Sequence, residues 1–517
     1  MMLMQTKQTK VKTVSIVIFI TLIGKIFGLG RDVLLGQSFG TGYTADALMV
    51  ASLIPRQFFD VVFAGAIGAS FIPILSDVFQ KGGKAEANAL ASSFFTLVGL
   101  FALSFSVFAF VFSAQIIALT ANFDPETHLL AARLLRIIFP SLFFTGIAFS
   151  FVGFLQTFGE FKVPAAISVF SNGILIIYLL FFTGRFGVYG AAFAMLLGWA
   201  AQAFVQIPAL KKQGFSYRLR LWHPEIKNIG KLMLPVMLST WVFPVNMLIM
   251  LSFASRFLGG ASSIGFANSL YLMVVGIFVL SVTNVIFPEL SRLSDDKTKA
   301  EFTHLVRKTT RTLLFFLIPM TVGVMLLSTP LVRLLYQRQE FTAHSTALTS
   351  SALFYLCIGM VGFGLLNLFT RVFYAQKRGG PPIIAGITSI LTTVLLCFLL
   401  VDHMAIAGLG LASGISLLVG AGILAVFTHK TLDGGLFANR FFVDMFKMLF
   451  SAAVMGILVF FLRNFFASIL DEGMLGRLLL VALPALFGIA TYFFLAYVLQ
   501  LEEIHFLRKL LGREARP

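Results

Sequence analysis

The stretch PIIAGITSILTTVLLCFLLV, which runs from Pro382 to Val401, contains no charged residue. Twenty residues in a helix cover about 30 Å, the thickness of the hydrocarbon core of a bilayer. Similar stretches recur along the whole chain, at about 14–37, 45–76, 88–119, 129–156, 163–184, 188–210, 228–256, 262–290, 310–329, 345–375, 382–401, 406–428, 441–466 and 475–500. The sequence therefore predicts an all-α polytopic membrane protein with about 14 transmembrane helices.

The composition excludes an ordinary soluble protein. Of the 517 residues, 58% are hydrophobic and 12% charged, whereas soluble domains carry about 25% charged residues. The two cysteines, Cys357 and Cys397, lie in apolar stretches, so neither a disulfide framework nor a cysteine-based metal site is expected. The histidines show no metal-binding spacing, and the chain contains no phosphate-binding loop motif for ATP. We therefore expect no cofactor, no metal and no catalytic residues.

The positively charged residues are concentrated in the loops between the predicted spans. Lys and Arg number 39 against 22 Asp and Glu, a net charge of +17. The basic residues gather at the N-terminus and in every second loop, and the 330–344 loop, with Arg333 and Arg338, is the one basic loop on the opposite side. By the positive-inside rule both termini face the cytoplasm, as an even number of spans requires. Most of the excess charge thus sets orientation, and no nucleic-acid partner is expected.

An internal repeat divides the chain. Residues 162–167 align with 380–385 at a shift of 218, and the same shift places Gly190 on Gly408. Upstream, 71–76 matches 286–291 at a shift of 215. A shift that spans six helices gives two copies with the same topology, as in transporters built from parallel repeats. We predict an N-lobe (1–220), a C-lobe (221–434) and two further helices with a basic cytoplasmic tail (435–517), with a central cavity between the lobes.

Ionisable residues are concentrated in the first two predicted spans, which contain Lys25, Arg31, Asp32, Asp46, Arg56 and Asp60. Such residues are costly at bilayer depth and usually face a cavity or a partner. Arg56 and Asp60 are four residues apart and can pair on one helix face. One interpretation is that these are structural pairs and interfacial charges. The other is a cationic pocket in the N-terminal half, which would suit an anionic substrate such as a diphosphate.

The second half has no equivalent charged set. Its corresponding helices offer Asn246, Asn268 and Ser269 instead. Pro55 and Pro244 fall inside predicted spans, where we expect them to kink the helix and free backbone carbonyls.

Several motifs give the chain a family resemblance. They are Gly24-Lys25-Ile26-Phe27-Gly28-Leu29-Gly30-Arg31-Asp32, then Ala45-Asp46-Ala47, Ile54-Pro55, Phe71-Ile72-Pro73-Ile74, Tyr336-Gln337-Arg338 and Arg371-Val372-Phe373-Tyr374-Ala375. In these motifs, and in its fourteen spans, the chain resembles the MurJ (MviN) family of lipid II flippases, within the wider exporter superfamily of polysaccharide flippases and multidrug antiporters.

The resemblance implies a fold and a site. Members flip the lipid-linked peptidoglycan precursor by alternating access, with the diphosphate in a cationic central cavity and the polyprenyl tail in a groove of the last two helices. Arg31, Asp32 and Asp46 match the family directly, and Lys25 stands where the family usually has Arg. The family's arginines in spans two and eight fall on Phe59 and Ser269, with Arg56 one turn before Phe59. An Asp linked to sodium binding in some members falls on Met250, so the coupling ion and the exact headgroup stay open.

These observations lead to one main hypothesis: a bacterial inner-membrane flippase for lipid II. Lys25, Arg31 and Arg56 would hold the diphosphate, and Asp46 and Asp60 would position those cations or couple to protons. Asp32, Asn268 and Ser269 complete the predicted substrate site. Expected partners are lipid II or a related undecaprenyl-diphosphate-linked glycan and membrane lipids, with coupling to the membrane potential or to ions. The rivals are a flippase for another such glycan, a multidrug antiporter of the same fold, and an enzyme acting on lipid-linked sugars.

Overall fold

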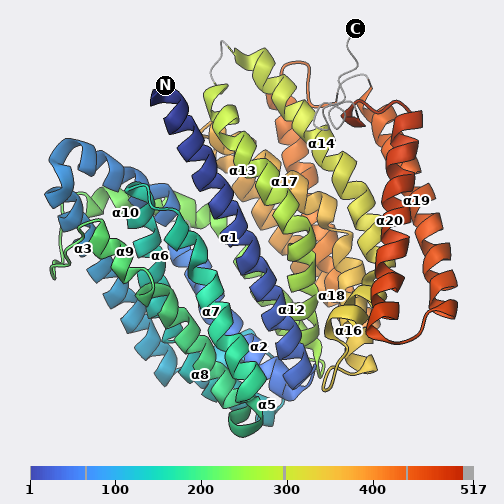
Figure 1. The fold of residues 1–517 in the computed structure, drawn as a ribbon, viewed down its shortest axis with the longest axis horizontal. Coiled ribbons are helices and arrows are strands. Elements are labelled where there is room, and N and C mark those ends of the chain that lie inside the picture. Colours follow the sequence, from blue (N-terminus) through green and yellow to red (C-terminus); the bar gives the residue numbers. More distant parts are fainter. Residues whose placement is uncertain (1, 65–66, 295–297, 438–439, 505–517) are drawn as a thin grey trace. The chain divides into compact units, whose positions relative to one another are not determined.

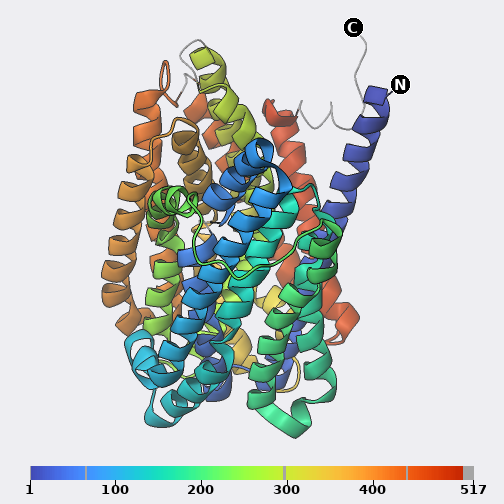
Figure 2. The same cartoon turned by 90° about the vertical axis from the view of Figure 1, so that its left-hand side faces the viewer.

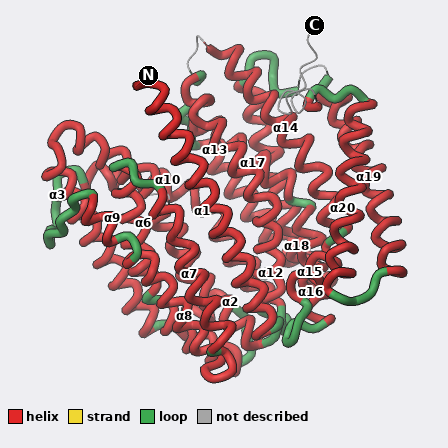
Figure 3. The backbone as a smooth tube through the Cα atoms, in the orientation of Figure 1, coloured by secondary structure: helices red, strands yellow, loops and turns green. Residues whose placement is uncertain are grey.

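The computed structural model describes residues 2–64, 67–294, 298–437 and 440–504. These residues are mostly helical, and no strand occurs among them (Figure 3), which confirms the all-helical prediction. Contacts divide the chain into two compact units. Unit 1 runs to Ser262 and includes Arg338–Phe341, and unit 2 comprises Ser263–Gln337 and the chain from Thr342 onward. This division follows contacts, so it leaves the lobe boundaries predicted from the repeat as a prediction.

Unit 1 contains eleven α-helices and two π-helices among its described residues. They are α1 (Met2–Phe39), α2 (Tyr43–Phe59), η1 (Asp60–Ala64), η2 (Ile67–Phe71), α3 (Ile72–Val111), α4 (Ser113–Thr120), α5 (Pro125–Ile138), α6 (Ser141–Thr157), α7 (Lys162–Phe181), α8 (Thr183–Phe204), α9 (Ile207–Lys212), α10 (Ile226–Thr240) and α11 (Val242–Ala254). In Figure 1 and Figure 2 the long helix α1, in dark blue, runs beside α7.

Helix α12 (Gly260–Tyr271) begins in unit 1 and continues into unit 2. The described helices that follow are η3 (Leu272–Gly276), α13 (Ile277–Arg292), α14 (Lys299–Leu326), α15 (Ser328–Tyr336), α16 (Ala343–Cys357), α17 (Met360–Ala375), α18 (Gly380–Thr431), α19 (Phe441–Ile469) and α20 (Met474–Val498). The last two form a hairpin, drawn in red in Figure 1, that packs on α14.

Within the described residues, the fourteen predicted spans fall on helical segments, but helices and spans do not correspond one to one. Nine helical segments of the described chain are long and apolar enough to cross a membrane, and the pair α16 and α17, bent by 47°, makes a tenth. Helix α18 holds two predicted spans, joined at Ala405, and α3 turns at Gly83. The number of membrane crossings therefore remains a prediction.

The internal repeat reappears in the backbone at the larger of the two shifts found in the sequence. Helix α8 is interrupted at Gly187 (φ 53°, ψ −144°), and α18 is interrupted at Ala405 (φ 48°, ψ −128°). Glycine adopts this conformation readily, whereas a side chain makes it strained. The same sharp reversal thus joins the helices of both copies, with glycine in the first and alanine in the second.

The two hairpins also cross at matching residues. In unit 1 a Cβ on Gly198 would lie 2.7 Å from the backbone oxygen of Ser171, so only glycine fits there. In unit 2 the Ser389 hydroxyl donates to the Ser416 carbonyl at 3.1 Å. Small residues at such crossings let helices approach closely in a membrane.

Helix caps repeat in the same way. The Asp124 side chain accepts from the Thr127 backbone N–H at 3.0 Å at the start of α5. Thr342, which the repeat aligns with Asp124, accepts from the Ser345 backbone N–H at the start of α16. Both caps satisfy a donor that the first turn of a helix leaves without a partner.

The two predicted proline kinks have different outcomes. The helix breaks at Trp241, between α10 and α11 and three residues before Pro244. At Pro55, by contrast, α2 continues without interruption, and the irregularity comes five residues later as the π-helix η1. A proline keeps a helical φ and removes one hydrogen bond, so the helix can continue through it when the ladder adjusts nearby.

Candidate functional site

Three polar side chains meet where α1 packs against α7. The Arg31 guanidinium donates to Asp32 Oδ1 from Nε at 2.9 Å and from Nη2 at 2.6 Å. Its Nη1 donates to Asn172 Oδ1 on α7 at 3.1 Å. The Asn172 amide in turn donates to the Gly24 carbonyl at 3.4 Å. The structure therefore pairs two of the predicted site residues, Arg31 and Asp32, and adds Asn172 to them.

Glycines on α1 allow this close approach. Any Cβ on Gly24 would collide with the Ser168 hydroxyl of α7, and a Cβ on Gly28 would lie 3.6 Å from the Asn172 amide nitrogen. Gly24, Gly28 and Arg31 lie on one face of α1, because residues four and seven apart share a face. This face presents backbone to α7, so that a short amide can reach both a carbonyl and a guanidinium.

Lys25 lies on the neighbouring face. Its side chain is exposed, and it has no carboxylate within 4 Å in the described chain. Lys25 and Asp32 are seven residues apart, so they share a stripe of α1 about 10 Å apart along the axis. Lys25 and Arg31 thus lie on the same helix, and Lys25 has no ion-pair partner among the described residues.

Arg56 and Asp60 lie at the junction of α2 and η1. Arg56 is exposed and Asp60 half-buried, and the two interact electrostatically. They form no direct ion pair within 4 Å among the residues that the structure describes. The predicted i, i+4 pairing is therefore loose, and the π-helix that starts at Asp60 alters the spacing on which it depended.

Asp46 lies in the first turn of α2 and is buried. Its Oδ2 accepts from the Gly259 backbone N–H at 2.7 Å. Its Oδ1 accepts from the backbone N–H and the hydroxyl of Ser262, both at 2.7 Å. Its hydrogen bonds among the described residues thus go to the start of α12 and not to a cation, and a role in positioning the cations or in coupling to protons stays a prediction.

The predicted residues of the second half belong to unit 2. Asn268 and Ser269 are both half-buried on α12, and neither makes a hydrogen bond within the described residues. Each unit is placed by itself, so their part in one site with Arg31 remains a prediction.

Sequence reasoning missed Asn172 and Ser262 as partners. Asn172 is the one amide side chain between residues 163 and 184 of the apolar fifth span, which was a usable signal because amides inside spans usually bond across helices. Ser262 left no comparable signal, since serine is common in these helices.

The last helix pair is held to α14 by a partly buried charge cluster at one end. Arg311 pairs with Asp444 of α19 at 3.0 Å and, beyond α20, with Glu502 at 2.8 Å and Glu503 at 2.9 Å. Burial raises the pKa of Glu503 above its ordinary value. Midway along α14, the Tyr492 hydroxyl donates to the Phe315 carbonyl at 2.8 Å.

The other end of this hairpin is held as well. Arg463 donates to the Leu326 carbonyl at 2.9 Å, and Arg333 pairs with Glu472 at 2.7 Å. Arg333 lies on α15, so the segment predicted as a basic 330–344 loop is helical up to Tyr336. This pair accounts for one of its two arginines, because Arg333 matches a carboxylate in the loop between α19 and α20.

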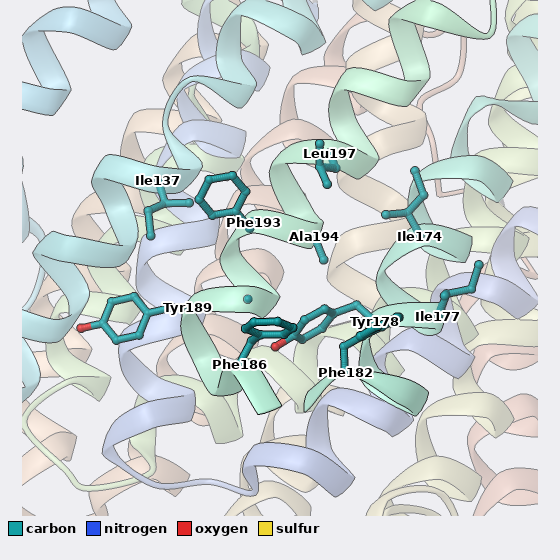
Figure 4. A pocket seen from close by; sticks show the side chains of 11 residues that line it. Ile137, Ile174, Ile177, Tyr178, Phe182, Phe186, Tyr189, Phe193, Ala194 and Leu197 are labelled. Atoms are coloured by element: carbon teal, nitrogen blue, oxygen red, sulfur yellow. The ribbon is translucent and has the colours of Figure 1, made fainter. Parts of the chain in front are cut away.

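An apolar groove of about 530 Å³ lies elsewhere in unit 1 (Figure 4). Its lining comes from α5, α7 and α8 and includes Tyr178, Phe186, Tyr189 and Phe193. Its lining contains none of the predicted site residues and no charged group, so it offers no cation to an anionic headgroup.

Comparisons with known proteins identify a family. A model of the family described as "Lipid II flippase MurJ" matches residues 35–481. The lipid II flippase MurJ of Burkholderia cenocepacia is 27% identical over 95% of this chain and 97% of its own length. The probable lipid II flippase MurJ of Treponema pallidum is also 27% identical, over 80% of each chain.

Solved structures give the same result. A lipid II flippase MurJ in an inward closed conformation superimposes with a TM-score of 0.79 at 25% identity, over 96% of this chain and 99% of that one. A multidrug transporter of the MATE family, in an inward-facing conformation, reaches a TM-score of 0.66 at 16% identity and shares the fold alone. From its sequence and its fold, this chain belongs to the MurJ family of lipid II flippases.

Proposed function

We propose that this chain flips lipid II from the inner to the outer leaflet of the bacterial cytoplasmic membrane by alternating access, and so supplies precursor for peptidoglycan synthesis. Lys25, Arg31 and Arg56 bind the diphosphate. As a member of a transporter family, the chain performs no bond chemistry on the substrate.

The arrangement around Arg31 supports this proposal most strongly. A guanidinium has five N–H donors. Asp32 and Asn172 engage three of them, on Nε, Nη2 and Nη1. Within the described residues, one N–H on each terminal nitrogen has no partner. Two donors on neighbouring nitrogens match two oxygens of a phosphate, which is the preferred arginine–phosphate contact.

Charge balance supports the same assignment. Asp32 neutralises much of Arg31, and the Asp46 carboxylate is held by Gly259 and Ser262. Lys25 and Arg56 have no carboxylate within 4 Å in the described chain. Unpaired cations at membrane depth are costly unless a counter-charge or water reaches them. A diphosphate supplies that counter-charge, whereas a cationic drug would add to the repulsion.

The same donors would bind the diphosphate of any polyprenyl-linked glycan, so these contacts do not select the glycan.

We also propose an energy source. A cavity that carries net positive charge responds to the membrane potential, since each charge that crosses the field contributes about 2.3 kcal/mol per 100 mV. Coupling to an ion is the alternative.

Depletion of the protein in its host, followed by identification of the lipid-linked precursor that accumulates in the inner leaflet, tests the proposal. We expect lipid II to accumulate and peptidoglycan synthesis to stop. Accumulation of a different polyprenyl-diphosphate glycan, with lipid II unchanged, would contradict the assignment and point to that glycan as the substrate.

A further inference from the structure

We propose that Asn172 is a positioning residue for substrate binding: it holds the Arg31 guanidinium in place on α1 without neutralising it. This inference rests on the proposed function, because it concerns how the diphosphate site is built. Asn172 itself need not touch the substrate.

Both polar atoms of the Asn172 amide form hydrogen bonds. The residue is 8% exposed, and its Nδ2 donates to Gly24 while its Oδ1 accepts from Arg31. A flipped amide would set a donor against the guanidinium and an acceptor against the carbonyl. The two contacts therefore fix the orientation of the amide, and the amide fixes the position of Nη1 relative to the backbone of α1.

Side-chain direction explains why one amide can reach both groups. Long side chains on a helix point back toward its N-terminus. Arg31 therefore extends along α1 toward Gly28 and Gly24, and Gly28 presents no Cβ to Asn172. Asn172 lies opposite this stretch of α1 and contacts the helix backbone and the arginine side chain together.

A neutral partner suits this position. Asp32 already supplies one carboxylate to Arg31 through two hydrogen bonds. A second carboxylate in place of Asn172 would leave the guanidinium with a surplus of negative charge around it and would repel a diphosphate. An amide orients the arginine by hydrogen bonding and adds no further negative charge, so the N–H donors and the charge that Asp32 leaves uncompensated stay available to the substrate.

Two nearly isosteric substitutions separate this role from simple helix packing. Asn172→Asp preserves shape but adds a negative charge, and Asn172→Leu preserves volume but removes both hydrogen bonds. Purified full-length variants would be titrated with farnesyl diphosphate, a soluble polyprenyl diphosphate, and affinity measured by isothermal titration calorimetry. Ser168→Ala, which changes the same α1–α7 interface away from Arg31, is the matched control.

We expect Asn172→Asp to weaken binding by well over tenfold, Asn172→Leu by about tenfold and Ser168→Ala by less than twofold, since the loss of a hydrogen bond to a charged group is worth about one decade of affinity. A packing role predicts the opposite order, with Leu worse than Asp. If Asn172→Asp does not fold, wild-type affinity in Asn172→Leu alone overturns the proposal.

The Arg31→Gln variant distinguishes failure of the positioning role of Asn172 from failure of the diphosphate site. If Arg31→Gln loses binding while both Asn172 variants keep it, the positioning role is wrong and the diphosphate site stands. If Arg31→Gln binds farnesyl diphosphate as tightly as wild type, the proposed site itself is wrong.

Discussion

Asp46 and Ser262 are joined by two hydrogen bonds of 2.7 Å to a single carboxylate oxygen, one from the backbone N–H and one from the hydroxyl of Ser262. The other oxygen accepts from Gly259. A carboxylate from α2 thus caps the N-terminus of α12, where the helix dipole also favours a negative charge. A cap supplied by a distant helix ties the start of α12 to α2 within unit 1.

Asp46→Ala should therefore destabilise the protein. It leaves the buried backbone N–H groups of Gly259 and Ser262 without an acceptor, whereas the Ser262 hydroxyl keeps the Gly259 carbonyl at 3.3 Å. We expect a loss of about 1–3 kcal/mol in the free energy of unfolding. Thermal unfolding of the purified protein in detergent measures this loss. Ser262→Ala removes only the hydroxyl contact and should cost about 1 kcal/mol or less. Equal effects of the two variants would show that the carboxylate does not act as the cap.

Arg311→Met should loosen the last helix pair. The substitution keeps much of the volume but leaves the buried Asp444 and the half-buried Glu503 without their cation. Loss of one partner from a buried pair costs about 3–5 kcal/mol. Hydrogen exchange along α19 and α20 should increase more than exchange in unit 1. Glu502→Gln is the control, because Glu502 is exposed and its pair is worth about 1 kcal/mol at most.

The repeated hairpin predicts that exchanging glycine and alanine at the two equivalent turns changes the free energy of unfolding in opposite directions. Ala405→Gly should raise the free energy of unfolding, because Ala405 holds a left-handed φ of 48° that glycine adopts without strain. Gly187→Ala should lower it at the equivalent turn, although the added Cβ meets no atom within 4 Å. Each change should amount to about 1–2 kcal/mol. Effects of the same sign would contradict the equivalence of the two turns.

The cap of α5 should make the free energy of unfolding depend on pH. Hydrogen bonds from Thr127 hold the pKa of Asp124 below its ordinary value. Since the folded-state pKa is the lower one, the stabilisation is complete above about pH 4 and is lost as the pH falls through the folded value. Asp124→Asn keeps an acceptor that does not titrate, so this variant should lose less stability than wild type between pH 6 and pH 3, by at most about 1 kcal/mol.

The matched comparison for that prediction is the cap of α16. Thr342→Ala removes an uncharged cap and should cost a similar amount at every pH. A pH-dependent effect of Thr342→Ala would show that another group titrates in this range and would undermine the assignment to Asp124.

The sequence predicted the features that depend on long patterns. Apolar stretches long enough to cross a bilayer located the helices. The internal repeat, at its shift of 218, pairs the positions where the structure then shows the same turn, Gly187 with Ala405, and a matching helix cap, Asp124 with Thr342. The adjacency of Arg31 and Asp32 also required no tertiary information. Each of these follows from local composition or from comparison of the chain with itself.

What the sequence could not supply depends on partners far apart in the chain. Asn172 meets Arg31 across 141 residues, and Ser262 meets Asp46 across 216. Nothing in the local pattern around Asp46 distinguishes a carboxylate that caps a helix from one that pairs with a cation. The π-helix begins five residues after Pro55, so a local propensity for a kink placed the irregularity about one turn too early.

The central claim is that Arg31 takes part in moving lipid II across the membrane. The most direct measurement is the fraction of lipid II exposed in the outer leaflet of cells whose own flippase is depleted and that carry this chain, either unchanged or as Arg31→Gln at matched membrane abundance. We expect the unchanged chain to restore outer-leaflet lipid II and the Arg31→Gln variant to leave it in the inner leaflet. Restoration by both forms would contradict the assigned site, and restoration by neither would contradict the function itself.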